Sequence, residues 1–281
     1  MTGYKLPRTE IEWSRRAIVN VVSVLAVHAD ALTLVGAHAV LLRTMDLDVP
    51  LIPTGDGDLG VTPGLVGDLP SLESLLVEAG YEHRTTARPG LWGREPYVAA
   101  DGSSAFREKI DLLAPHGLSG TVSRTKRGVP ALQSAHGKLA VGNALGLELA
   151  AFNRSVMTIT DFADPRLSVE IYVAELPALI LAKGSKVGER LREPRKGAVR
   201  DKDLGDLWRL LVVTDPEEFA RVVAEFVDHP LAGPGVRQSL EWTAGVLADP
   251  LSRERAKSTF DTFVDPAEID RVFDLWRNVV R

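Results

Sequence analysis

Two aspartates two positions apart, Asp56 and Asp58, form the pattern in this sequence best suited to chemistry. On a β-strand this spacing points both carboxylates to one face, about 6.5 Å apart along the chain. Such a pair can hold magnesium, which prefers oxygen ligands and is commonly shared between carboxylates and substrate phosphates. Gly55 and Gly57 flank the aspartates and would leave room for a triphosphate. Taken alone, the pattern is more typical of a turn exposed to solvent.

Two further features favour a phosphate-handling site. Asp111 interrupts an apolar run at residues 110–113, where an acid is expected only beside a metal, a partner or an exposed face. Gly36 separates a β-rich run from a helical one, and the N–H groups that begin a helix can bind an anion. The alternatives are an ordinary turn glycine and a strand with one wet face. The order of the three features along the chain favours the functional interpretation.

A basic segment follows in the second half. Lys183, Lys186 and Arg190 share one side of a predicted helix, with Lys183 on or beside its apolar stripe. Residues 183–202 contain eight Lys or Arg against three acids, although the whole chain carries a net charge of −5. The segment is a candidate for binding triphosphate or an RNA backbone, and a solvated surface helix is the alternative.

The elements that must position these residues follow from periodicity and turn signals. The first half predicts an α/β arrangement: helices at residues 9–28, 37–45 and 71–79, strands at 32–35, about 56–61 and 169–173, and a β meander at about 81–115. From residue 176 the pattern is helical to the end. We therefore expect an α/β (α+β) domain with a mixed sheet at 1–172 and a mainly helical domain at 173–281.

The order of a glycine turn before a helix, a strand with Asp-x-Asp and a later strand with one Asp resembles the nucleotidyltransferase fold of the DNA polymerase β superfamily. The resemblance implies that Asp56, Asp58 and Asp111 hold the catalytic metal. It also implies that Asp111 activates the attacking hydroxyl.

The second half resembles the AbiEii family, which are nucleotidyltransferase toxins of bacterial toxin–antitoxin pairs. The residues that carry this resemblance are the strand-to-helix run 171–179, then Lys183, Arg190, Lys202, Asp203 and Asp206. The family implies that Lys183, Asp203 and Asp206 complete the active site from the helical domain. Thr54 matches a small hydroxyl residue before the first acid, and we expect it to bind the nucleotide together with Gly36 and Ala37. Ala37 stands where the family usually has Gly or Ser after Gly36.

The resemblance implies a magnesium-dependent transferase that moves a nucleoside monophosphate from a nucleoside triphosphate to RNA, particularly tRNA, with a cognate antitoxin as a possible partner. One alternative is a small-molecule adenylyltransferase of the aminoglycoside resistance kind. Another is an inactive relative that binds nucleotide or docks a partner. P-loop and GxSxG motifs are absent from the sequence.

Composition limits the other classes. The 281 residues are 45% hydrophobic and 25% charged, which is typical of a globular protein. The absence of cysteine excludes thiolate catalysis and sulfur-ligated zinc, and it fits the cytoplasmic location that we expect. The most apolar stretch, residues 17–27, is too short to span a bilayer, so we expect no membrane partner.

Overall fold

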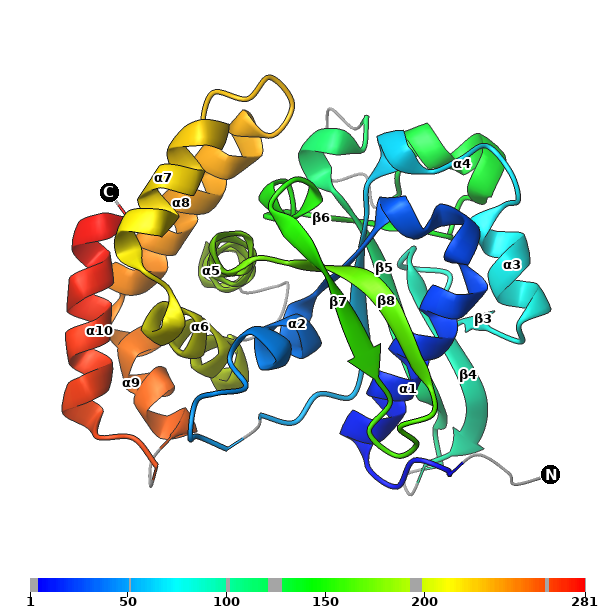
Figure 1. Ribbon diagram of the computed structural model, residues 1–281, viewed down its shortest axis with the longest axis horizontal. Coiled ribbons are helices and arrows are strands. Elements are labelled where there is room, and N and C mark those ends of the chain that lie inside the picture. Colours follow the sequence, from blue (N-terminus) through cyan, green and yellow to red (C-terminus); the bar gives the residue numbers. More distant parts are fainter. Residues whose placement is uncertain are drawn as a thin grey trace. The chain divides into compact units, whose positions relative to one another are not determined.

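The protein is an α/β structure with a mixed sheet and many helices (Figure 1). The computed structural model describes residues 5–50, 52–99, 102–120, 128–192, 199–260 and 263–280. The chain divides into two compact units that are not continuous in sequence. The first unit comprises Met1–His38, Pro53–Ala144 and Arg154–Val173, and the second comprises Ala39–Ile52, Leu145–Asn153 and Ala174–Arg281.

The first unit is built on the mixed sheet. Its strands are β1 (Leu32–Val35), β2 (Gly57–Val61), β3 (Glu82–His83), β4 (Leu91–Val98), β5 (Ser104–Pro115), β6 (Gly142–Ala144), β7 (Arg154–Thr160) and β8 (Ser168–Ala174). They follow the order β3-β4-β5-β2-β1-β8-β7, and β6 pairs with β5. β2 is antiparallel to β1 and parallel to β5, so β2 joins the two halves of the sheet. Apolar side chains of these central strands are fully buried, among them Leu34, Leu59 and Leu112.

Four α-helices lie in the first half of the described chain. They are α1 (Glu10–Val24), α2 (Gly36–Arg43), α3 (Leu72–Glu78) and α4 (Pro130–His136), and two of them, α1 and α3, begin with a side-chain cap. Thr9 and Glu12 form the expected capping box at the start of α1. Short 3-10 turns lie at Ala26–Ala31, Pro63–Leu65, His116–Leu118 and Leu149–Ala151. α1 packs along β5 and β2 (Figure 1).

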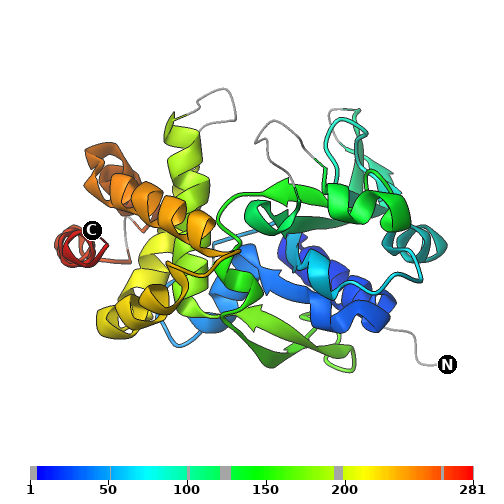
Figure 2. The same cartoon turned by 90° about the horizontal axis from the view of Figure 1, so that it is seen from above.

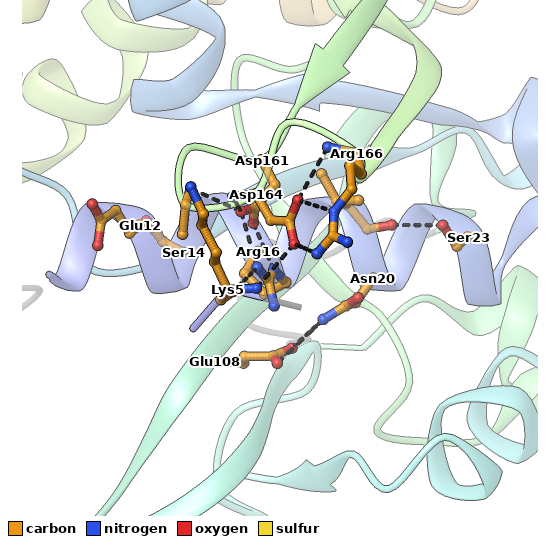
Figure 3. Close-up of polar contacts among 12 residues, drawn as sticks. Lys5, Glu12, Ser14, Arg16, Asn20, Ser23, Glu108, Asp161, Asp164 and Arg166 are labelled. Atoms are coloured by element: carbon orange, nitrogen blue, oxygen red, sulfur yellow. Dashed lines mark hydrogen bonds and ion pairs between the residues drawn. The ribbon is translucent and has the colours of Figure 1, made fainter. Parts of the chain in front are cut away.

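A polar network fixes α1 to the connection between β7 and β8 (Figure 3). Arg16 pairs with Asp161 at 2.6 Å, and the Asp161 side chain is fully buried. Arg16 also donates to the carbonyl of Lys5 at 2.8 Å, and the Lys5 N–H donates to Asp164 at 2.9 Å. Because a buried charge is costly without a partner, a displacement of α1 that separated Arg16 from Asp161 would be unfavourable.

The second unit is helical. It contains α5 (Leu176–Arg192), α6 (Asp201–Val213), α7 (Pro216–Phe226), α8 (Gly233–Ala248), α9 (Pro250–Thr259) and α10 (Pro266–Val279). α5 and α8 cross closely, as Figure 2 shows. A Cβ added at Gly184 of α5 would lie 2.0 Å from the Thr243 hydroxyl of α8, so this crossing requires glycine. Trp276 of α10 donates to the carbonyl of Leu211 at 2.9 Å.

Most elements expected from the sequence are present, with differences at their ends. The helix expected over residues 9–28 ends at Val24 and continues as a 3-10 turn. The strand expected at about 56–61 begins at Gly57, so Asp56 lies in the turn before it. Within the described ranges, we find no helix whose length and apolarity would suffice to cross a bilayer.

Candidate active site

The register of the sheet brings Asp58 and Asp111 together. β2 and β5 are parallel neighbours, and Asp58 stands directly opposite Asp111. Residues opposite each other on adjacent strands point to the same face, and such strands lie about 4.8 Å apart. Both side chains are only partly exposed. Two carboxylates separated by 53 positions in the sequence therefore share one end of the sheet, as the metal-site hypothesis requires.

Gly36 makes room for this pair. Val35, the last residue of β1, stands opposite Asp58, and Gly36 then begins α2 with a φ of +67°. A Cβ at Gly36 would lie 2.0 Å from Oδ2 of Asp58, so no other residue fits here without displacing the carboxylate. Ala37 follows in the first turn of α2 and is half-buried. Gly36 is thus more than a turn glycine, because the Asp58 carboxylate occupies the space that a side chain at position 36 would need.

Asp56 is held by the turn that precedes β2. The buried Thr54 hydroxyl lies 3.3 Å from Oδ1 and 3.3 Å from the carbonyl oxygen of Asp56. The Thr54 carbonyl in turn accepts from the buried Ser14 hydroxyl of α1 at 3.2 Å. The prediction that Thr54 contacts the nucleotide stays a prediction, and its visible contact is to the first acid.

The charges of Asp58 and Asp56 affect the pKa of Asp111. Burial raises the pKa of Asp111 to about 7 from its ordinary value of 3.8, and the charges of Asp58 and Asp56 raise it further against the opposing effect of Arg84 and Arg88. A proton on Asp111 is therefore held far more tightly than on an ordinary aspartate. This places all three acids of the sequence prediction within electrostatic reach at one site.

Arg84, which the sequence analysis did not identify, contacts the site directly. Its guanidinium donates to Oδ1 of Asp111, and both side chains are largely buried, at 18% and 15% exposure. Arg84 follows β3, and its N–H donates at 2.9 Å to the carbonyl of Leu91, which stands opposite Asp111. The pairing depends on the register of β3, β4 and β5, and no local sequence signal reveals it.

The donor set suits a hard cation. Three carboxylates with too few compensating cations hold a proton near neutral pH, and a magnesium ion relieves the same excess of negative charge through oxygen ligands. Within the parts of the chain that the structure describes, no three acidic or histidine side chains stand ready-made around a metal position. One oxygen of Asp111 is instead bonded to Arg84, so Arg84 competes with a cation for this carboxylate.

In the second unit, the residues predicted from the AbiEii resemblance form a buried ionic network. Lys183 is 3% exposed, and its ammonium lies 2.5 Å from Asp206 and 3.7 Å from Asp203. Asp203 also contacts Arg190 at 2.5 Å and Lys186 at 3.3 Å. The apolar stripe of α5 thus does carry a buried lysine, which pairs with acids of α6.

The pKa of Asp203 is shifted in the opposite direction to that of Asp111. Burial alone would raise its pKa, but Lys183, Lys186 and Arg190 together outweigh burial and hold the pKa of Asp203 well below its usual range. Lys186 is 42% exposed and is the cation of this network most accessible to solvent. The remainder of the predicted basic segment includes Arg195 and Lys196, which lie outside the described residues.

The predicted site residues thus form two groups. One group lies at one end of the sheet of the first unit and comprises Asp56, Asp58, Asp111, Gly36 and Thr54. The other lies between α5 and α6 of the second unit and comprises Lys183, Lys186, Arg190, Asp203 and Asp206. That the two groups act on one substrate stays a prediction. No family model, curated protein or solved structure matches this chain.

Proposed function

We propose that the protein is a magnesium-dependent nucleotidyltransferase with a polymerase β-like catalytic domain. It moves a nucleoside monophosphate from a nucleoside triphosphate to an acceptor hydroxyl. The observation that carries the proposal is the pairing of Asp58 with Asp111 on neighbouring strands, beside Asp56 and against the start of α2 at Gly36. A structural role does not explain three partly exposed carboxylates kept together, because their mutual repulsion opposes folding.

Each acid has a distinct task in this proposal. Asp56 and Asp58 hold magnesium, which when bound neutralises charge on the triphosphate. Asp111, which stands opposite Asp58 on the neighbouring strand, would accept the proton of the acceptor hydroxyl. The acceptor oxygen forms a bond to the α-phosphorus, the bond to the β-phosphate oxygen breaks, and pyrophosphate leaves.

The second unit supplies positive charge in this proposal. Lys183, Lys186 and Arg190 carry three positive charges against the two of Asp203 and Asp206, and this surplus favours a triphosphate or an RNA backbone. We propose RNA, particularly tRNA, as the acceptor, and a role as the toxin of a toxin–antitoxin pair in the cytoplasm. A small regulator encoded by the adjacent reading frame is the expected partner.

The direct test is transfer of label. The protein is incubated with magnesium, RNA from cells and each of the four nucleoside triphosphates labelled at the α-phosphate, and the RNA and protein fractions are separated. We expect labelled RNA with the wild type and none with Asp56→Ala combined with Asp58→Ala. Equal labelling by both proteins would remove the assignment.

The chain contains its own matched control. Asp46 and Asp48 have the same spacing as Asp56 and Asp58, and both are exposed. Their double alanine variant removes the same charge and should label RNA as the wild type does. Magnesium-dependent binding of nucleotide without any transfer would instead identify a nucleotide-binding protein, and transfer to an added aminoglycoside but not to RNA would identify a small-molecule adenylyltransferase.

A further inference from the structure

Arg84 sits at the carboxylates because the backbone holds it there. It is the first residue after β3, and its N–H is bonded to Leu91 at the start of β4. The connection between them ends at Gly90, whose N–H and carbonyl are bonded at 2.8 Å to Leu139 and Leu112. A Cβ at Gly90 would lie 2.2 Å from the Leu112 carbonyl oxygen, so this end of the connection is pressed against β5. The fold therefore fixes the backbone position of Arg84, whereas its long side chain can contact different partners.

The guanidinium of Arg84 does not use all of its hydrogen-bond donors. One terminal nitrogen donates to Asp111, but the Nε of Arg84 is buried and has no hydrogen-bond partner among the residues that the structure describes. A buried donor left without an acceptor costs about 1–3 kcal/mol. The Nε and terminal nitrogens of arginine form a planar fork that matches two oxygens of a phosphate. An unpartnered donor beside a proposed triphosphate site points to an anionic ligand.

A second arginine lies in the same connection. Arg88 is close enough to lower the pKa of Asp111 through its charge, as Arg84 does. One short connection therefore carries two positive charges that act on Asp111. A structural ion pair for Asp111 alone needs only one of them.

We propose that Arg84 binds the triphosphate of the nucleotide, and that its bond to Asp111 is the resting position of this side chain. The inference rests on the proposed function. In the protein without a cation, Arg84 neutralises Asp111. When the carboxylates hold a divalent cation, Arg84 releases Asp111 and donates its fork, including Nε, to phosphate oxygens.

This inference predicts effects of opposite sign on two ligands. Because Arg84 competes with a cation for Asp111, removing its charge should strengthen binding of a divalent cation alone. Removing it should weaken binding of nucleotide, because a charged hydrogen-bonded contact to phosphate is lost. An arginine that only pairs with Asp111 would strengthen cation binding when removed and would not weaken binding of the nucleotide.

The test compares the wild type with Arg84→Gln and Arg84→Lys. Manganese binding is measured by electron paramagnetic resonance of the free ion, and binding of an α,β-methylene triphosphate analogue with manganese is measured by calorimetry. For Arg84→Gln we expect manganese to bind several-fold more tightly and the analogue about tenfold or more weakly, as loss of one charged hydrogen bond implies. Arg84→Lys should keep the charge and lose the fork, so its affinity for the analogue should lie between the two.

Two controls separate the possible failures. Arg221→Gln removes an exposed arginine of α7 and should change neither affinity, and thermal unfolding checks that each variant is folded. Unchanged analogue affinity in Arg84→Gln, or weaker manganese binding, overturns the inference while the proposed function stands. A folded wild type that binds neither manganese nor the analogue overturns both.

Discussion

Replacing Asp111 by asparagine should stabilise the protein as the pH rises, although it removes a proposed catalytic group. Burial beside Asp58 raises the pKa of Asp111 to about 7 in the folded protein, against an ordinary value of 3.8 that applies to the unfolded chain. Between these values the folded state holds a proton that the unfolded state has released. Stability contributed by the protonated group is therefore complete below about pH 4 and is lost as the pH rises through about 7.

The size of the effect follows from the two pKa values. At about 1.36 kcal/mol per pH unit, the ionised carboxylate costs up to about 4 kcal/mol above pH 7, and less where the structure relaxes. Asparagine stays neutral and can still accept a hydrogen bond from Arg84, so it resembles the protonated acid. From pH 5 to pH 8 the stability of Asp111→Asn relative to the wild type should rise by up to about 2.5 kcal/mol.

Thermal unfolding in buffer with a chelator, at pH 5, 6, 7 and 8, measures this difference. A gain of this size corresponds to at most about 5–10 °C in Tm for a chain of this length. Asp46→Asn changes an exposed aspartate and should follow the wild type at every pH. Parallel curves for Asp111→Asn and the wild type, or a less stable variant at pH 8, would show that Asp111 is not buried against repelling carboxylates.

Other substitutions test the remaining contacts. Gly36→Ala should cost about 1–3 kcal/mol of stability and weaken manganese binding, because its Cβ would displace the Asp58 carboxylate from 2.0 Å away; wild-type Tm and manganese affinity in this variant would contradict the geometry. Lys183→Met should cost about 3–5 kcal/mol in denaturant unfolding, because it leaves buried acids with one cation fewer. Lys186→Met, at a side chain 42% exposed, should cost well under half as much, and equal costs would refute the distinction.

Local sequence patterns predicted the helices and strands, because these depend on residues close together in the chain. The capping box of Thr9 and Glu12, the short strand before Gly36 and the strand at residues 169–173 depend on neighbours within a few positions, so periodicity and capping reveal them. The Asp-x-Asp pattern was less informative, because Asp56 lies in a turn and only Asp58 lies on β2. The orientation of Asp56 is set by its contact with Thr54 and cannot be read from strand alternation.

Contacts that depend on strand register could not be predicted. Asp111 was identified because an acid in an apolar run is conspicuous, but Arg84 is one arginine among many and lies in a connection without regular structure. Only the pairing of Leu91 with Asp111 brings it to the site. Helical spacing placed Lys183 on or beside the apolar stripe but left open whether its ammonium reaches water. Its burial and its acidic partners depend on how α5 packs against α6.

The turn that carries Asp56 is connected by hydrogen bonds to α1 and α2. An arginine Nε is always a donor, so the contact of Arg15 with Nδ1 of His38 at 3.3 Å leaves that nitrogen without a proton. The proton of neutral His38 is then on Nε2 and is donated to the Ser14 hydroxyl at 2.8 Å. The single Ser14 hydroxyl proton is then shared between the Ile11 carbonyl at 3.1 Å and the Thr54 carbonyl at 3.2 Å. The chain therefore supports the backbone of Thr54, whose side chain contacts Asp56.

The two ionic clusters consequently differ in what they leave available. Asp203 contacts three cations, which lower its pKa. The cluster stabilises the packing of α5 on α6, and the negative charge of Asp203 is compensated, so little of it is left to attract a cationic ligand. Asp111 contacts Arg84 beside two other acids, and its pKa is raised to about 7. Three cations thus hold Asp203 in its ionised form, whereas burial and two neighbouring acids favour the protonated form of Asp111. A cation bound beside Asp111 would relieve that repulsion, and this difference is why we propose the metal at the sheet of the first unit.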